Sequence, residues 1–289
     1  MELSDKFTRV TGSRNYRDPD RRTVAQRLRN IYEATPDEVK EAGMNWYGQV
    51  HDAVGKSGLG LTRGAGIVAA VSPNMDFENN NIHALREVQE MKPEHWDLIR
   101  HAAGRKGGRT DIAAMLQEVA PGMSAAPTPN LLKAHAILNG AHPDDVLPAK
   151  TAPKTNSFFH NIHDPSDDRY ATVDGRQADT ITDVMRPWSD ETRNPHGEKL
   201  TSDRGISSSQ STRGVTRHDQ YVGHVKTAAK SLGIRPNQLQ AVTWLHGQNI
   251  ERGFDPTRKQ GDARRGQSYQ HRLKQQEQLM EFHSARGAG

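Results

Sequence analysis

The stretch that decides the fold runs from Leu147 to Asp174. It begins Leu147-Pro148-Ala149-Lys150-Thr151-Ala152-Pro153-Lys154-Thr155-Asn156-Ser157-Phe158-Phe159, passes through a polar spacer and reaches Thr172-Val173-Asp174. A Leu-Pro turn therefore leads into a Lys-Thr pair, and an isolated Val-Asp pair follows, with Asp174 lying 20 residues after Lys154 (174 − 154). The pattern predicts a short helix, a hairpin turn and a second helix, with a carboxylate further along the chain.

This stretch resembles the helix-hairpin-helix DNA glycosylases, whose Leu-Pro-Gly-x-Gly-x-Lys-Thr hairpin is followed, about that far on, by a Val-Asp pair. The resemblance implies that Asp174 is the catalytic carboxylate. It implies that Lys154 is the nucleophile in an enzyme that also cuts the strand. Uncharacterised phage-type proteins of this group look closer still, since they share the Trp46-Tyr47 helix, the Ala-x-Ser-Pro turn and the Lys-Thr-x-Ser-Phe helix.

Three other segments follow the order of that family over about residues 60–250. Residues 65–74 resemble its early apolar helix, which ends in polar residues that face the DNA lesion. Residues 132–138 resemble the helix before the hairpin, and residues 240–247 resemble a late helix. The side chains that the resemblance places at the DNA are Lys150, Thr151, Thr155, Ser72, Asn74 and Arg176.

The chain also departs from the family pattern. Ala149 and Thr151 stand where the hairpin has glycines, and the turn is one residue longer. In the family those glycines let backbone N–H groups approach a DNA phosphate, which side chains would obstruct. Gly175 follows Asp174 where a threonine is usual, and the absence of cysteine excludes the iron–sulfur cluster of some members.

Each candidate residue has a plainer interpretation. Asp174 can be the N-cap of a helix over residues 175–185, and this role is compatible with catalysis. Lys154 can be a surface lysine near a phosphate. His160-x-x-His163 has a spacing that suits a metal on one helix face, but we expect no metal and no cofactor.

Three functions follow from these patterns. The first is a DNA glycosylase, or a related enzyme, that acts on a modified base flipped out of duplex DNA. The second is a non-catalytic DNA-binding or host-directed phage protein on the same fold. The third is an enzyme that builds a hypermodified base. The sequence names neither the base nor the oligomeric state.

Composition sets broad limits on the chain. It has 289 residues, 33% of them hydrophobic, which suits a modest core with long polar connections. No apolar run approaches the roughly 18 residues of a membrane span, and the charged N-terminus is unlike a signal peptide. Without cysteine, the chain is expected in the cytoplasm. A net charge of +4 gives a mild bias toward polyanions such as DNA.

Apolar residues recur at helical spacing, so we expect an all-α fold of nine to eleven helices. Thr35 is the expected N-cap of a helix that reaches about Gly55. The tryptophans Trp46, Trp96 and Trp244 lie on apolar stripes and are expected in the core. The predicted organisation is a loose arm (1–22), one helical domain (23–250) with a disordered insertion (186–218), and a basic tail (251–289).

Overall fold

The protein was analysed as a computed structural model, which describes residues 21–73, 82–123, 126–174, 177, 211–212 and 215–254. Its α-helices are α1 (Arg21–Ala34), α2 (Asp37–Gly55), α3 (Leu61–Val71), α5 (Ile82–Glu90), α6 (Pro93–Ala102), α7 (Gly108–Val119), α8 (Thr128–Leu138), α9 (Pro143–Val146), α10 (Pro153–His163), α12 (Arg217–Leu232) and α13 (Pro236–Phe254). A 3₁₀ turn, η2 (Pro121–Met123), joins α7 to α8.

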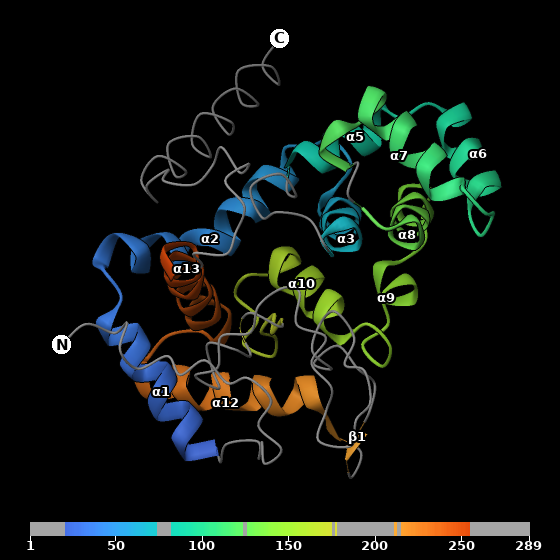
Figure 1. Ribbon diagram of the computed structural model, residues 1–289. Helices are drawn as coiled ribbons and strands as arrows, with labels where there is room; N and C mark the ends of the chain where they lie inside the picture. The colour runs from blue at the N-terminus through green and yellow to red at the C-terminus, as the bar shows by residue number, and fades with distance from the viewer. Residues whose placement is uncertain are drawn as a thin grey trace. The chain divides into compact units, whose positions relative to one another are not determined.

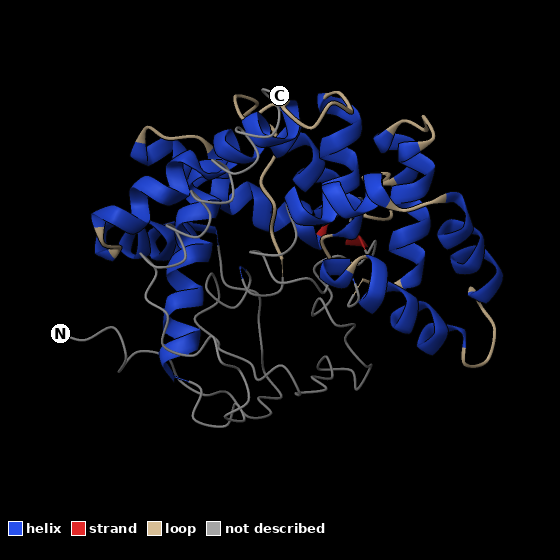
Figure 2. Cartoon of the chain, turned by 90° about the horizontal axis from the view of Figure 1, so that it is seen from above, coloured by secondary structure: helices blue, strands red, loops and turns tan. Residues whose placement is uncertain are grey.

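The described chain is helical apart from one small pair of strands (Figure 2). Strands β1 (Ser211–Thr212) and β2 (Val215–Thr216) are antiparallel neighbours, with Ser211 opposite Thr216. The all-α class is therefore confirmed. Every described helix is too short or too polar to cross a membrane.

The described residues form two compact units. Unit 1 contains residues up to Tyr47 together with the described residues from Ser166 to Phe254, and unit 2 contains the described residues of Gly48–Pro165. Helix α2 contributes its first half to unit 1 and its second half to unit 2. The expected boundaries of a single domain near residues 22 and 250 stay predictions.

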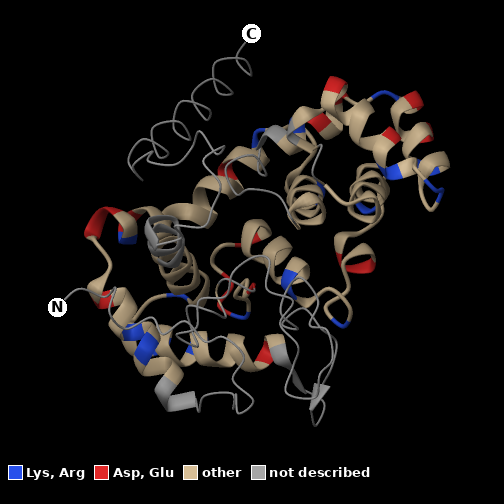
Figure 3. Cartoon of the chain, viewed as in Figure 1, with Lys and Arg blue, Asp and Glu red and all other residues tan. Residues whose placement is uncertain are grey.

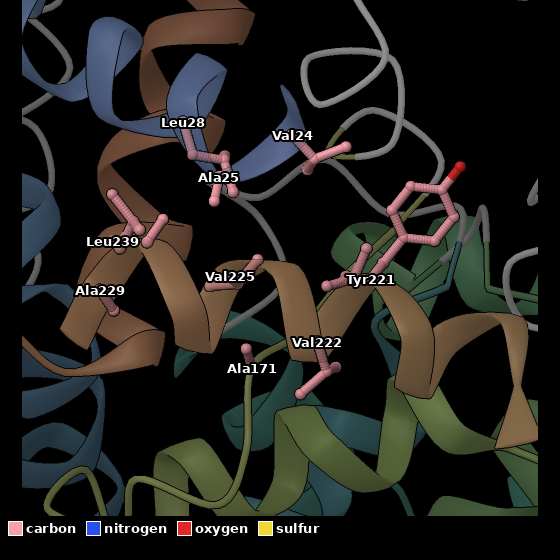
Figure 4. Packing of buried hydrophobic residues seen from close by; sticks show 11 residues of the cluster. Val24, Ala25, Leu28, Ala171, Tyr221, Val222, Val225, Ala229 and Leu239 are labelled. Carbon is pink, nitrogen blue, oxygen red and sulfur yellow. The ribbon is translucent and has the colours of Figure 1, made fainter. Parts of the chain in front are cut away.

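Unit 1 is built on α1, α12 and α13, which pack against one another. Figure 4 shows the buried apolar side chains of α1 and α12 meeting above Ala171, with Leu239 of α13 beside them. Val24 and Leu28 of α1 are fully buried there, as is Val225 of α12. Burial of each such side chain stabilises the fold by roughly 1.5–3 kcal/mol before entropy costs. The loop carrying Ala171 and Val173 is thereby anchored just before Asp174.

Unit 2 is organised around α3, which packs against α8, α10 and α5 (Figure 1). Residues Gly64–Val71 of α3 are all buried, as the all-round apolar sequence predicts. Glycine makes this possible at Gly66, because a Cβ there would lie 2.5 Å from Cγ of Pro143 at the start of α9. The absence of a side chain at Gly66 thus lets α9 approach α3 closely.

Two expectations need correction. The predicted insertion, 186–218, contains β1 and β2 at its end, and α12 begins within it at Arg217. Thr35 was expected to cap the helix that reaches Gly55, but its hydroxyl donates to the carbonyl of Ile31, one turn back in α1, at 2.6 Å. Thr35 therefore follows the last residue of α1, and its hydroxyl contacts His246. Residues 186–210 and 255–289 of the predicted insertion and tail lie outside the described residues.

Candidate functional site

Asp174 lies in unit 1, half-buried at the end of the loop that follows α10. Its Oδ1 accepts the backbone N–H of Gln177 at 2.7 Å, which is the hydrogen bond of a helix N-cap. Its Oδ2 accepts the indole Nε1–H of Trp244 at 3.1 Å. Both oxygens of the carboxylate are therefore oriented by donors, one from the next turn of chain and one from α13.

Gln177 fixes the same turn to α13 through its side chain. Its Nε2 donates to the hydroxyl of Thr243 at 2.7 Å, and the glutamine is fully buried. The Thr243 hydroxyl in turn donates to the carbonyl of Leu239, one turn earlier in α13, at 2.8 Å. Consecutive residues of α13, Thr243 and Trp244, thus bind the two ends of the Asp174–Gln177 turn.

Further buried polar residues of α13 bind other helices of unit 1. Tyr47 donates its hydroxyl to Gln240 at 2.7 Å, which ties α2 to α13. His246 Nδ1 lies 3.1 Å from the Thr35 hydroxyl. Because that hydroxyl already donates to Ile31, we assign the proton to His246 Nδ1. Burial lowers the pKa of His246 below its usual value, which favours this neutral form.

The hairpin lies in unit 2, between α9 and α10 (Figure 1). Its turn closes on the Pro148 carbonyl, which accepts the backbone N–H groups of Thr151 and Ala152 at 3.0 and 2.8 Å. The expected order of a short helix, a turn and a second helix is present, and the turn contains no glycine. Lys150 and Thr151 are exposed in the turn, whereas Lys154 is half-buried in the first turn of α10.

The predicted catalytic pair is divided between the two units. Lys154 belongs to unit 2 and Asp174 to unit 1, so their pairing stays a prediction. Thr155 follows Lys154 in α10 and is half-buried. The Ser72 hydroxyl donates to the Ala69 carbonyl at 3.0 Å at the end of α3, which is an ordinary contact at a helix terminus. Asn74 and Arg176 lie outside the described residues.

A second polar cluster, in unit 2, was missed by sequence reasoning. Asp144 of α9 accepts both the amide of Asn156 at 2.8 Å and the Nε2 of His160 at 3.0 Å. The backbone N–H of Asp144 donates to His142, the N-cap of α9. Asn156 also donates to the Leu147 carbonyl at 2.9 Å. The cluster therefore ties α9 to α10 and holds the hairpin closed.

The two histidines of the His-x-x-His pattern have different partners. His160 contacts Asp144, whereas His163 Nε2 contacts the Thr62 hydroxyl of α3 at 3.0 Å. Burial is the largest cause of the lowered pKa of His163, and the neighbouring His160 lowers it further. Within the described part of the chain, no group of acidic and histidine side chains has the geometry of a metal site.

The tryptophans divide into two kinds. Trp46 and Trp96 are buried, as predicted. Trp244 was expected in the core and is partly buried there, packed against the cluster of Val39, Ala42 and Leu245, while its N–H donates to Asp174. Trp188 lies outside the described residues.

The strongest chemical candidate is thus Asp174, a carboxylate held in one orientation and still partly accessible. Each carboxylate oxygen can accept more than one hydrogen bond, so the two observed donors leave acceptor capacity. Such a group can stabilise a nearby positive charge or accept a proton from water. Elsewhere, basic and acidic positions are interspersed over the described helices (Figure 3).

Residues 13–251 match a family described as "Family of unknown function (DUF7178)". No curated protein matches the chain. No solved structure matches it either.

Proposed function

The chain belongs to the DUF7178 family, and we propose that it is a glycosylase-like enzyme that acts on a modified base flipped out of DNA. The observation that carries the proposal is the half-buried Asp174 carboxylate, whose two oxygens are oriented by Gln177 and Trp244. The resemblance of the Leu147–Asp174 stretch to helix-hairpin-helix glycosylases supplies the reaction class.

The chemistry asks little of the protein beyond placement and charge. As the bond between C1′ and the base nitrogen breaks, its electron pair leaves with the base and positive charge develops on the sugar. A fixed carboxylate stabilises that charge, because it needs no reorganisation during the reaction. Water then forms the new bond to C1′, and its proton passes to Asp174 or to the departing base. Asp174 can serve in both steps.

The hairpin supports binding to the DNA backbone. Lys150 and Thr151 are exposed in its turn, and Lys154 and Thr155 follow in the first turn of α10. Lysine and hydroxyl side chains are common phosphate contacts, which position a protein on DNA without reading the sequence. We therefore propose that the hairpin provides affinity and that the Asp174 turn provides chemistry.

One observation favours a non-catalytic DNA-binding protein instead. The bond from Gln177 N–H to Asp174 shows that this carboxylate acts as an N-cap, and a cap alone would account for an aspartate here. The bond from Trp244 exceeds what a cap requires, which is why we prefer the enzyme.

Replacement of Asp174 by Asn separates these two functions. A screen of duplexes that each carry a different modified base first identifies the substrate. On it, Asp174→Asn should slow single-turnover base release by roughly 10²–10³-fold, because the variant loses the charge placed for the transition state. DNA affinity at low salt should change less than twofold.

Full activity in Asp174→Asn would contradict the assignment, since asparagine caps about as well as aspartate. Base release from none of the duplexes, together with salt-sensitive DNA binding by the parent protein, would favour the non-catalytic protein. No DNA binding at low salt would exclude both.

The role of Lys154 has its own test. If its amine attacks C1′, borohydride should trap a covalent adduct between protein and DNA, and Lys154→Gln should abolish the adduct. We expect no adduct and near-parental base release by Lys154→Gln, because α10 begins after a turn that departs from the family's glycine-rich hairpin. A trapped adduct would show the lysine route and overturn this expectation.

A further inference from the structure

The Asp174 carboxylate is bound from two independent directions. The N-cap bond comes from Gln177, three residues along the chain, whereas the indole bond comes from Trp244, 70 residues away on α13. A cap is complete with the first bond alone. The second bond fixes the rotation of the carboxylate about its terminal torsion, which is otherwise a soft degree of freedom.

The contact between Gln177 and Thr243 leaves one polar atom of the Gln177 side chain in an unfavourable environment. Its Nε2 binds Thr243, but its buried Oε1 has no hydrogen-bond partner among the described residues. An unsatisfied buried carbonyl is unfavourable, and an apolar side chain of similar shape would avoid it. The amide is nevertheless held against Thr243, the residue next to Trp244.

The two donors that face the two oxygens also favour an aspartate over an asparagine at position 174. An indole N–H and a backbone N–H can only donate, so each requires an acceptor. An ionised carboxylate satisfies both at once. An asparagine would satisfy one and turn its own NH₂ group toward the other.

We propose that Trp244 is a positioning residue, which with the Gln177–Thr243 contact aims the ionised Asp174 carboxylate. The kinetic consequence rests on the proposed glycosylase function, whereas the physical coupling between Trp244 and Asp174 does not. The indole N–H, rather than the bulk of the ring, is the group that acts.

The coupling is tested by chemical unfolding of four proteins: the parent, Asp174→Asn, Trp244→Phe and the double variant. If the indole aims the carboxylate, the effects of the two substitutions should not be additive. The unfolding equilibrium constant of the double variant should then be about tenfold more favourable to the folded state than the two single variants predict. Trp96→Phe is the matched control for loss of an indole, because the buried Nε1 of Trp96 has no hydrogen-bond partner. Additive losses, within twofold, would overturn the proposal.

The kinetic arm uses single-turnover base release on the substrate found by the screen. Trp244→Phe should slow the chemical step about tenfold at saturating enzyme, with DNA affinity unchanged, and Trp96→Phe should slow it less than twofold. A Trp244 analogue in which sulfur replaces the indole N–H should behave like Trp244→Phe although it fills the same space. Parental rates with that analogue would overturn the positioning role. A parent protein without base release would refute the proposed function, and the unfolding cycle would still decide whether Trp244 orients Asp174.

Discussion

The interior of unit 1 combines an apolar core with hydrogen bonds between distant segments, whereas the interior of unit 2 is organised by close packing around the apolar helix α3. In unit 1 three buried polar residues of α13 bind different segments: Gln240 binds Tyr47, Thr243 binds Gln177 and His246 binds Thr35. In unit 2 the central α3 is buried over Gly64–Val71 and presents only small or apolar side chains. The buried polar residues described there, Asn156, Ser157 and Asn161, all lie on α10.

This difference indicates in which unit the orientation of buried side chains is fixed most closely. Apolar packing tolerates volume-conserving exchanges, because dispersion and burial have little direction. Hydrogen bonds are directional and costly to leave unmade when buried, so they fix orientation. The candidate carboxylate lies in the unit whose interior fixes orientation, as a site that must place a charge would require.

The largest expected effect concerns Gly43 in unit 1. A Cβ there would lie 2.6 Å from the Cα of Val242, so α2 and α13 meet backbone to backbone. Gly43→Ala should lower the free energy of unfolding by about 2 kcal/mol or more, because backbone cannot yield as a side chain can. Gly48→Ala, on the same helix with open space at its Cβ, should instead stabilise by about 0.5–1 kcal/mol. Urea unfolding measures both, and equal effects would show that the crossing is looser than described.

A smaller effect is expected at the contact between Thr35 and His246. Thr35→Val keeps the shape and leaves the buried Nδ1–H of His246 without its acceptor, which should cost about 1–3 kcal/mol in unfolding free energy. Adding His246→Leu should recover much of that loss, since both polar partners are then gone. No recovery in the double variant would mean that packing, rather than the hydrogen bond, sets the cost.

The smallest expected effect is on the pH dependence of stability. Burial lowers the pKa of His246 in the folded protein. Its buried Nε2 has no hydrogen-bond partner among the described residues, so a proton taken up there would have no acceptor. Below a pH of about 6.5 the unfolded chain therefore takes up this proton first, so stability is lost as pH falls through the folded pKa. His246→Gln should reduce the loss of thermal stability that the parent shows as pH falls below about 6.5. His163→Gln, in unit 2, should do the same for a second lowered pKa, and an unchanged pH profile in either variant would contradict its assignment.

The sequence predicted the helices well because apolar spacing is a local signal. Residues 65–74 and 132–138 were expected to lie in helices, and α3 and α8 cover most of them, with Gly140 at a positive φ just beyond α8. The hairpin was likewise predictable from Pro148 and Pro153.

The site was less predictable because its contacts are not local. The N-cap role of Asp174 could be predicted from its position in the sequence. Its hydrogen bond to Trp244 could not, because the two residues are 70 apart and such a contact produces no periodic pattern in the sequence. The apolar spacing placed Trp244 against the core, where it packs, but did not predict the hydrogen bond of its indole to Asp174. Asp144 had only the Pro-Asp-Asp start of a short helix as a signal, and nothing in the sequence shows that Asn156 and His160 converge on it.

The contact between Thr35 and His246 joins residues 211 apart, and this separation has a consequence for how the chain folds during synthesis. All described residues of unit 2 lie between Gly48 and Pro165, so that unit can form while the ribosome is still translating. The apolar face of α1 is covered only after α12 and α13, the last two described helices, have been synthesised. A pause in translation after residue 165 would thus leave a nascent chain in which unit 2 is folded and the apolar face of α1 is exposed. In this state the chain would need chaperones most.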